Sequence, residues 1–188
     1  MSLEHLWAGW RSQYVISGPP PDRGAETAVE GDRDPGARPH DRPDEGAACV
    51  FCRIAASGPP AADNGILWMG ECTFAVLNAY PYASGHLMVL PTRHVQTLAE
   101  LSEGESAEMW SALRLGVAAL EAAYGPEGIN LGANLGRAAG AGIPRHLHLH
   151  AVPRWVGDTN FMTTVAGARV LPEALTVTWE RLTAAWPG

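Results

Sequence analysis

The chain has 188 residues, with 20 acidic and 13 basic side chains and a formal net charge of −7. This length suits one domain with a core of ordinary size. The acidic balance, without any block of lysines and arginines, argues against a nucleic-acid partner bound through phosphate neutralisation. A small anionic substrate is compatible with it, because a site can be locally positive inside an acidic protein.

Membrane and export signals are missing from the sequence pattern. No apolar run reaches the length of a membrane span, and no basic segment followed by an apolar stretch marks a signal peptide. The three cysteines, Cys49, Cys52 and Cys72, do not make a disulfide framework. We therefore expect no membrane partner and a reducing, cytoplasmic setting, with Cys72 as a core residue.

The first third of the chain differs in composition from the rest. Residues 1–16 contain Trp7 and Trp10 at helical spacing, which predicts a short N-terminal arm that docks on a core. Residues 17–48 are rich in Pro, Gly, Asp, Glu and Arg and nearly lack large apolar side chains, which is typical of a flexible linker or long loop. The packed domain is therefore expected to span residues 49–188.

Strands dominate the middle of that domain, at residues 66–69, 73–77, 86–90, 128–135 and from 146 onwards. Ser102 as N-cap, with Glu103 and Glu105 in the first turn, predicts one long helix that ends near Tyr124. Its apolar stripe consists of Met109, Ala112, Leu113, Val117 and Leu120. A C-terminal helix is predicted over residues 172–186, beginning with Pro172. This order indicates an α+β fold with an antiparallel sheet.

Three of the seven histidines lie within five residues of one predicted strand, at positions 146, 148 and 150. Side chains alternate across a strand, so these imidazoles share one face while Leu147, Leu149 and Ala151 face a core. We expect the histidine face to be exposed. Imidazoles there can act as a nucleophile, a proton carrier or a metal ligand near neutral pH. A surface strand with incidental histidines is the alternative.

Cys49 and Cys52 form a Cys-x-x-Cys pair, a spacing at which two thiolates can hold one tetrahedral zinc. His94 and His146 are the best candidates for the two remaining ligands of a structural Cys2His2 site. A redox pair is an alternative, but such pairs normally open a helix in a βαβ unit, which this linker boundary does not resemble. A second alternative is that the two cysteines lie at a domain edge and have no functional role. With His146 bound to metal, His148 and His150 are left for chemistry.

Residues 146–153 (HLHLHAVP) resemble the signature of the histidine triad (HIT) superfamily of nucleotide hydrolases and transferases. The resemblance extends over residues 49–165. Its further motifs are Leu77-Asn78, similar to the ribose-binding position, residues 84–91 (SGHLMVLP), similar to a Gly-His strand, and Asn134-Leu135-Gly136, similar to the segment before the triad. It implies a HIT-like fold with a five-stranded antiparallel sheet, a long helix and a C-terminal helix. It also implies a homodimer whose two sheets join into one.

The branch of the superfamily is indicated by longer matches. Residues 75–89 and 153–162, together with residues 6–11 (LWAGWR), resemble the actinobacterial diadenosine tetraphosphate phosphorylases. The cysteine pair, His94 and His146 match the zinc ligands of many bacterial members. By this resemblance we expect a structural zinc and neither a catalytic metal nor an organic cofactor.

Gly142 departs from the family pattern. Hydrolases usually carry a Gln four residues before the first triad histidine, where it can orient the reacting phosphate or water, and phosphorylases usually carry a Ser. Glycine leaves space and exposed backbone N–H groups, which suit an anion such as free phosphate. The loop from Gly136 to Gly142 is also one residue longer than in the hydrolases.

The resemblance implies roles for individual residues. His148 attacks the α-phosphorus and forms a nucleotidyl-histidine, while a neighbour keeps its other ring nitrogen protonated. His150 hydrogen-bonds a phosphate oxygen and His86 supports the site, although His86 can equally be a structural histidine. Asn134 and the Gly136 N–H are expected to bind phosphate oxygens, and Asn78 to bind the ribose hydroxyls, unless Asn78 is a simple turn residue. Arg154 is expected to contact phosphate, with a plain surface charge as the alternative. Trp155 is expected to stack on a base, with packing in a core or dimer interface as the alternative.

The leading hypothesis is therefore an enzyme that cleaves diadenosine polyphosphates with free phosphate, giving ADP and ATP. Three alternatives remain open at this point. One is a HIT hydrolase of dinucleoside polyphosphates or nucleoside phosphoramidates. Another is a non-catalytic nucleotide-binding module. The last is a catalytic zinc bound by His146, His148 and His150.

Overall fold

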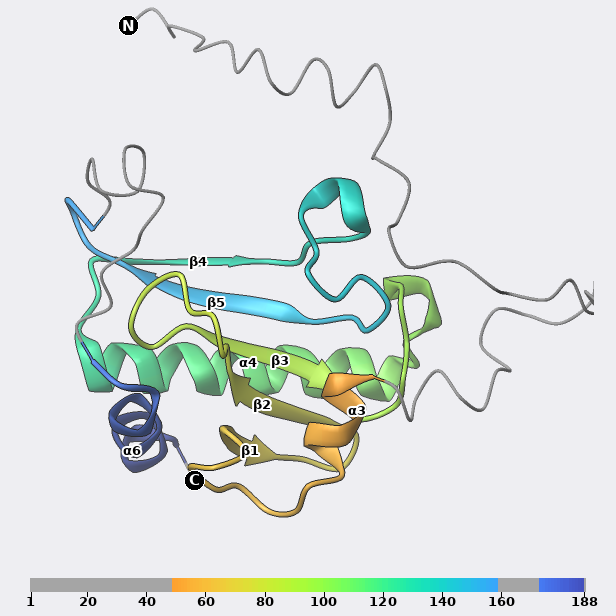
Figure 1. Ribbon diagram of the computed structural model, residues 1–188, viewed down its shortest axis with the longest axis horizontal. Helices are drawn as coiled ribbons and strands as arrows, with labels where there is room; N and C mark the ends of the chain where they lie inside the picture. The colour runs from red at the N-terminus through yellow and green to blue at the C-terminus, as the bar shows by residue number, and fades with distance from the viewer. Residues whose placement is uncertain (1–48, 159–172, 188) are drawn as a thin grey trace, which may run out of the picture. The chain divides into compact units, whose positions relative to one another are not determined.

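The computed structural model describes residues 49–158 and 173–187 (Figure 1). The expected N-terminal arm at 1–16 and linker at 17–48 lie outside the described residues, as does Pro172. Five strands form one antiparallel sheet in the order β1-β2-β3-β5-β4. The expected α+β fold with a five-stranded antiparallel sheet is confirmed.

The strands follow the predicted segments closely at β1 and β2 and less closely elsewhere. Their bounds are β1 Ile66–Met69, β2 Thr73–Leu77, β3 Leu87–Pro91, β4 Gly128–Gly132 and β5 Leu149–Arg154. β4 ends three residues earlier than expected, because its ladder with β5 ends at the pair Gly132–His150.

β5 starts three residues later than the sequence pattern suggests. Its pairing with β3 ends at Val89 opposite Leu149, so His146 and His148 precede the strand. Pro91, two residues beyond Val89, has no N–H to donate to a longer ladder. Its carbonyl instead accepts a hydrogen bond from Nε2 of His146 at 2.9 Å.

The long helix α4 spans Glu103–Tyr124, as predicted. Ser102 and Glu105 form a reciprocal capping box at its start, and Gly125 ends it in the left-handed conformation with φ 52°. Its buried stripe differs from the prediction, because Gly116 and Ala119 are also buried and Val117 is only half-buried. A Cβ on Gly116 would lie 3.1 Å from Leu87 Cδ1, so glycine lets the helix approach β3 closely.

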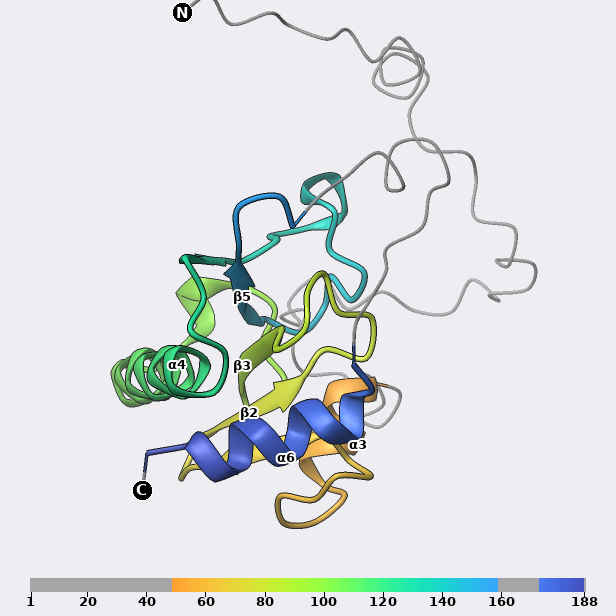
Figure 2. The same cartoon turned by 90° about the vertical axis from the view of Figure 1, so that its left-hand side faces the viewer.

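The sheet lies between α4 on one face and α3, Val50–Ala55, on the other (Figure 2). The face toward α4 holds the larger core, to which Leu147, Leu149 and Ala151 contribute as expected. The opposite face holds a smaller core in which Phe51 of α3 packs with side chains of β1, β2 and β3. No local sequence pattern had predicted α3.

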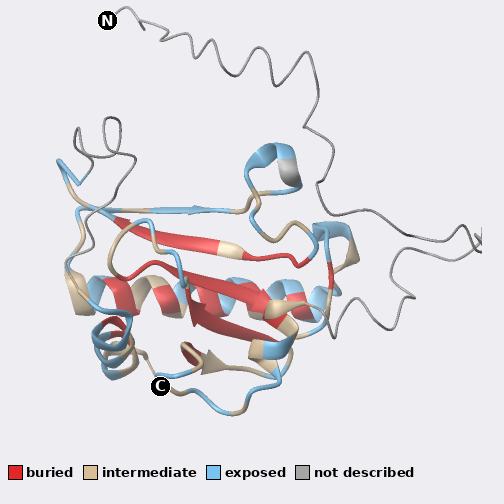
Figure 3. Ribbon diagram, in the orientation of Figure 1, coloured by how far each residue is buried: buried red, intermediate tan, exposed pale blue. Residues whose placement is uncertain are grey.

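The remaining elements complete the described fold. α6 spans Leu175–Ala185 and packs its Leu182 into the larger core; it begins three residues after Pro172, where the prediction placed its start. Two 3-10 turns cover Leu98–Glu100 (η1) and Arg137–Ala139 (η2). Burial is concentrated on β2, β3 and β5, whereas β4 at the sheet edge is mostly exposed (Figure 3). No helix in the described part of the chain has the length and apolar character needed to cross a membrane.

Candidate active site and metal centre

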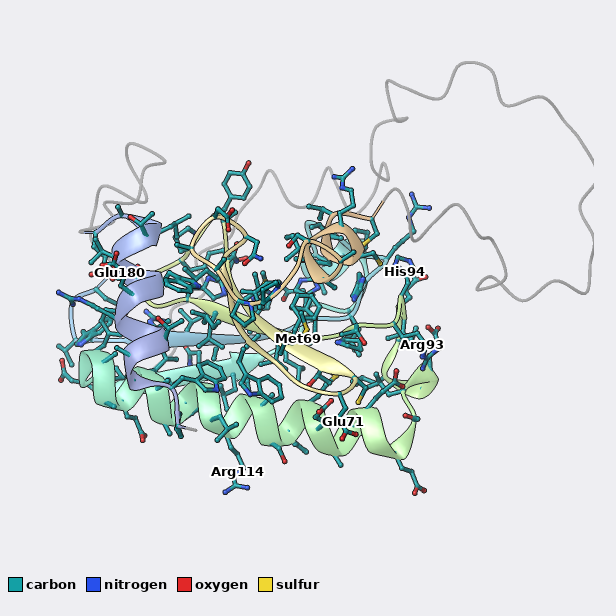
Figure 4. The ribbon with its side chains drawn as sticks, turned by 90° about the horizontal axis from the view of Figure 1, so that it is seen from below. Met69, Glu71, Arg93, His94, Arg114 and Glu180 are labelled. Atoms are coloured by element: carbon teal, nitrogen blue, oxygen red, sulfur yellow. The ribbon has the colours of Figure 1, made fainter. Side chains whose placement is uncertain are left out.

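Cys49, Cys52, His94 and His146 converge from three separate segments of the chain. Cys49 is the N-cap of α3 and Cys52 lies in its first turn. His94 follows β3, on the segment that leads to α4 (Figure 4), and His146 lies just before β5. One ligand atom from each residue lies within 4.8 Å of all the others. The predicted set of metal ligands is thus assembled in the structure.

The distances within this cluster suit a tetrahedral metal ion. Nδ1 of His146 lies 3.4 Å from the Cys49 Sγ and 3.6 Å from the Cys52 Sγ, and Nδ1 of His94 lies 3.3 Å from the Cys52 Sγ. Zinc bonds of about 2.3 Å to sulfur and 2.0–2.1 Å to nitrogen place the two atoms about 3.6 Å apart at the tetrahedral angle. The donor set and its spacing therefore fit zinc.

The protonation of His146 also fits a metal ligand. Its Nε2 lies 2.9 Å from the Pro91 carbonyl, which can only accept, so Nε2 carries the proton and Nδ1 presents a lone pair to the thiols. Burial lowers the pKa of His146 to about 4, which keeps the ring neutral. In the absence of a cation, burial and the neighbouring Cys49 raise the pKa of the Cys52 thiol to about 11. A bound metal would favour the thiolate.

The redox alternative for the cysteine pair lacks its structural context. The pair does begin a helix, α3, contrary to the sequence expectation of a plain linker boundary. However, all five strands in the described part of the chain are antiparallel, so no βαβ unit surrounds the pair there. Both sulfurs instead face histidine rings.

His148 is held by the main chain in one tautomer. Its Nδ1 lies 2.7 Å from the carbonyl oxygen of His146. A carbonyl only accepts, so Nδ1 carries the proton and Nε2 has the lone pair. The tautomer expected for a nucleophilic histidine is therefore set by a backbone group two residues earlier.

His86 and His150 form a second hydrogen-bonded pair beside His148. The Tyr82 N–H donates to Nδ1 of His86 at 3.1 Å, and Nε2 of His86 lies 2.9 Å from Nδ1 of His150. Because Nδ1 of His86 accepts, its Nε2 donates, and the remaining proton of His150 is on Nε2. Burial and the neighbouring His148 lower the pKa of His150 to about 4. Among the described residues, this buried His150 Nε2 has no hydrogen-bond partner.

The three triad histidines are buried, contrary to the expected exposed face. Their exposed fractions are 1% for His146, 6% for His148 and 9% for His150. The Phe51 ring packs against His146 and His148, with centroids 5.6 and 5.3 Å away, and Tyr82 packs against His86 at 4.6 Å. Sequence reasoning missed both aromatic residues, although one lies between the two cysteines.

The predicted substrate contacts on loops are half-buried at Asn78 and Asn134 and exposed at Gly136 and Gly142. Asn78 follows β2, and its amide nitrogen lies 3.3 Å from Nδ1 of His86, while its oxygen accepts the Tyr80 N–H. Asn134 is half-buried, and Gly136 is exposed with φ 82°. Gly142 is exposed, and a Cβ there would meet nothing within 4 Å.

Arg154 and Trp155 are not brought to the histidines. Arg154 lies four residues beyond His150 on β5, about 13 Å along an extended strand. Its guanidinium donates to both carboxylate oxygens of Asp158 at 2.6 and 2.7 Å and to the Asn130 side chain at 2.8 Å. The Trp155 ring lies edge-on to Tyr124 at the end of α4. In the described structure both residues make local contacts.

Comparisons with known proteins agree with this geometry. The HIT domain model matches residues 61–156. The chain is 36% identical to an AP-4-A phosphorylase of Mycobacterium tuberculosis over 186 residues, which covers 98% of this chain and 85% of that protein. A zinc-bound histidine triad family protein from Mycobacterium smegmatis is 30% identical with a TM-score of 0.59, covering 74% of this chain and 94% of that one.

A hypothetical histidine triad nucleotide-binding protein from Sulfolobus tokodaii has the same TM-score of 0.59 at 27% identity, covering 73% of this chain and 91% of that one. Both structural neighbours share the antiparallel α+β architecture. The family match includes His86, the three triad histidines and all five strands of the sheet. The chain therefore belongs to the HIT domain family of nucleotide-processing proteins.

Proposed function

We propose that this protein is a nucleotidyl-transfer enzyme that cleaves diadenosine polyphosphates with inorganic phosphate. The observation that carries the proposal is the fixed tautomer of His148, whose Nδ1 donates to the His146 carbonyl and whose Nε2 lone pair is left for attack. The similarity to a named AP-4-A phosphorylase over nearly the whole chain supports this substrate class.

The reaction proceeds by two displacements at one phosphorus atom. Nε2 of His148 attacks the α-phosphorus of diadenosine tetraphosphate, the bond to the bridging oxygen breaks, and ATP leaves. An oxygen of inorganic phosphate then attacks the adenylyl-histidine, the P–N bond breaks, and ADP leaves. Nδ1 of His148 keeps its proton and its hydrogen bond to the His146 carbonyl throughout, and this bond stabilises the positive ring of the intermediate.

His150 supplies the donor for the charge that develops on the phosphate. Its Nε2–H is buried and has no hydrogen-bond partner among the described residues. A non-bridging phosphate oxygen can therefore accept a hydrogen bond from it without displacing an existing one. His86 positions His150 through the 2.9 Å hydrogen bond between their rings. We assign Asn78 to the ribose hydroxyls, and Asn134 and the Gly136 N–H to phosphate oxygens.

Gly142 supports phosphorolysis over hydrolysis. Apart from its two chain neighbours, no residue lies within 4 Å of the position that its Cβ would take, which leaves room for a free phosphate ion beside the backbone N–H groups. A hydrolase of the family would place a glutamine side chain here to orient phosphate or water. A HIT hydrolase is therefore the second candidate.

We also propose that Cys49, Cys52, His94 and His146 hold a structural zinc, which when bound supplies a rigid link between α3 and the sheet. The geometry favours this site over a metal held by His146, His148 and His150. Nδ1 of His146 faces the thiols and its Nε2 faces the Pro91 carbonyl, so this ring has no nitrogen left for a second metal.

Product analysis on diadenosine tetraphosphate tests the reaction. We expect ADP and ATP in equal amounts, formed only when phosphate is added, and turnover reduced by at least about a thousandfold in His148→Ala. AMP and ATP without phosphate would make the protein a hydrolase. Nucleotide binding without turnover under either condition, unchanged by His148→Ala, would make it a non-catalytic binding module.

The metal content tests the zinc proposal. We expect one zinc per chain by elemental analysis, because four ligand atoms converge at one point. The Cys49→Ser variant should lose this metal, whereas Cys72→Ser, which changes the cysteine outside the cluster, should retain it. Full metal retention in Cys49→Ser, with loss in His148→Ala, would instead place the metal on the triad histidines.

A further inference from the structure

His146 belongs to the proposed metal centre through its side chain and to the reaction centre through its main chain. Its Nδ1 faces the sulfurs of Cys49 and Cys52 at 3.4 and 3.6 Å. Its carbonyl oxygen accepts the proton of His148 Nδ1 at 2.7 Å. One residue therefore connects the two sites without an intervening group.

The peptide group between His146 and Leu147 is not held by the sheet ladders. β5 begins only at Leu149, and its pairing with β3 and β4 involves no residue before it. The Leu147 N–H donates to the Val95 carbonyl at 2.7 Å. Val95 directly follows His94, the other histidine of the cluster, so one side of this peptide is attached to the second ligand segment.

The opposite side of the same peptide carries the carbonyl that fixes His148. Its direction depends on where the His146 side chain is anchored, because the ring and the carbonyl extend from the same Cα. The ring has two anchors, the Pro91 carbonyl on Nε2 and the thiol pair on Nδ1. A metal ion bound to Nδ1 would replace the weak contact with the thiols, and would tie the ring to the three other ligand residues through coordinate bonds.

Phe51 adds a second contact between the two centres. It lies between the two cysteines on α3, is 5% exposed, and packs its ring against both His146 and His148. α3 has only six residues and no side-chain hydrogen bond at its N-cap. A helix this short is not stable alone, so its position depends on tertiary contacts, among them the packing of Phe51 and the cysteine cluster.

We propose that the Cys49, Cys52, His94 and His146 site is a positioning device for the nucleophile, which orients the His146 carbonyl and thereby keeps His148 in the Nδ1–H tautomer. The inference deepens the proposed function and rests on it for the role of His148. It makes His146 a positioning residue that acts through its main chain.

The tautomer of His148 is the direct measurement. The full chain, labelled with ¹⁵N in its histidines, is compared at one fixed pH with zinc bound and after chelation, and the His148 signals are assigned by their loss in His148→Asn. We expect the zinc-bound chain to show a single Nδ1–H form and the chelated chain a mixture with the Nε2–H form. Cys52→Ser with zinc added should resemble the chelated chain, and Cys72→Ser should resemble the zinc-bound one.

Kinetics give the second readout. Because a misplaced tautomer affects the chemical step rather than binding, we expect kcat of Cys52→Ser to fall about 10- to 100-fold while KM stays nearly unchanged. A chelated chain that keeps the single Nδ1–H form would overturn the inference. So would loss of the native circular dichroism spectrum on chelation, since the metal would then hold the whole fold rather than one peptide.

These outcomes separate the inference from the proposed reaction. A zinc-dependent tautomer in a chain that turns over no nucleotide would support the positioning role and reject the proposed function. Phosphorolysis with a tautomer indifferent to zinc would support the function and reject the positioning role.

Discussion

The Glu108 carboxylate on α4 accepts three hydrogen bonds from the turn between β1 and β2. Its Oε1 accepts the Glu71 N–H, and its Oε2 accepts the Cys72 N–H and thiol, each at 2.7 Å. Burial opposes ionisation of Glu108, but these donors outweigh it and hold its pKa below the usual range. The sequence analysis placed Cys72 in the core, but the residue is half-buried at a turn. Burial and the neighbouring Glu108 raise the pKa of its thiol to about 11.

We expect Glu108→Gln to lower the free energy of unfolding by roughly 1–3 kcal/mol, because the amide offers one acceptor oxygen where three donors need partners. Urea denaturation measures the change. Glu121→Gln, on an exposed position of the same helix, is the matched control and should shift stability by less than about 0.5 kcal/mol. Equal effects of the two variants would show that the turn does not depend on Glu108.

At the scale of elements, the start of α4 also anchors the segment that carries His94. Nε and a terminal nitrogen of Arg93 donate to the two oxygens of Glu105 at 2.9 and 2.8 Å, and Glu105 also closes the capping box with Ser102. Arg93 and its neighbour His94 are seen side by side in Figure 4. The Arg93 hydrogen bonds, despite burial of the carboxyl, lower the pKa of Glu105 to about 2.

This pKa predicts a pH dependence of stability. A carboxyl whose pKa is lower in the folded chain stabilises it fully above the unfolded pKa of about 4.5, and the contribution is lost as pH falls toward 2. We expect Glu105→Gln to cost roughly 2 kcal/mol at pH 7, reduced from the full shift because Arg93 is half exposed, and almost nothing near pH 2. Denaturation at several pH values measures the difference from the unmodified chain.

Glu103→Gln serves as the control for that series, because it removes a carboxylate from the same first turn at an exposed position. Its effect on stability should be a few tenths of a kcal/mol, roughly the size of a helix-dipole contribution. A cost of Glu105→Gln that stays constant from pH 7 to pH 2 would contradict the role assigned to the Arg93 pair.

Elements with local signals could be predicted from the sequence, and elements held by tertiary contacts could not. The caps Ser102 and Gly125 lie within a turn of α4, so both of its ends were predicted. α3 has no side-chain hydrogen bond at its N-cap and is stabilised by contacts of Phe51 with distant strands, which no local pattern reveals. The late start of β5 depends on its pairing with β3, which ends at Val89 opposite Leu149, sixty residues later in the chain.

The same distinction holds for the candidate site. The Cys-x-x-Cys spacing predicted the cysteine pair of the cluster, and the alternation of histidines predicted the core side of the triad segment. His94 and His146 were chosen as the remaining ligands, and the family resemblance supported that choice. The burial of the histidines was not predictable, because the rings that cover them come from other segments, Phe51 on α3 and Tyr82 on the turn after β2. The tautomers of His86 and His146 were not predictable either, because they depend on main-chain groups such as the Tyr82 N–H and the Pro91 carbonyl.

At the scale of the whole molecule, β4 leaves one edge of the sheet without a partner among the described residues. It pairs only with β5, and four of its five residues are exposed. An open edge with an apolar side chain such as Leu131, 47% exposed, is suited to pairing with a second copy. We therefore keep the homodimer as a proposal, together with the cytoplasmic setting that would keep the cysteines reduced.

Light scattering after size exclusion tests this assembly. We expect the mass of two chains for the unmodified protein and of one chain for Leu131→Glu, which places a charge on the β4 edge. The matched control is Leu98→Glu on η1, where the original side chain is 52% exposed but lies on no sheet edge. A single-chain mass for the unmodified protein, or dissociation by both variants, would argue against dimerisation through β4.

The distance along the chain between Cys49 and His146, 97 residues, has a consequence for how the protein folds. β1, β2 and β3 follow one another through short turns, whereas β5 must return across α4 to pair with β3. Such non-local pairing is slow to form, so the fourth ligand arrives only when the sheet is nearly complete. The proposed zinc would then join segments 97 residues apart and would bind late in folding, after β5 has paired with β3. The rate at which the zinc site forms would therefore be limited by the pairing of β5 and not by the capture of the ion.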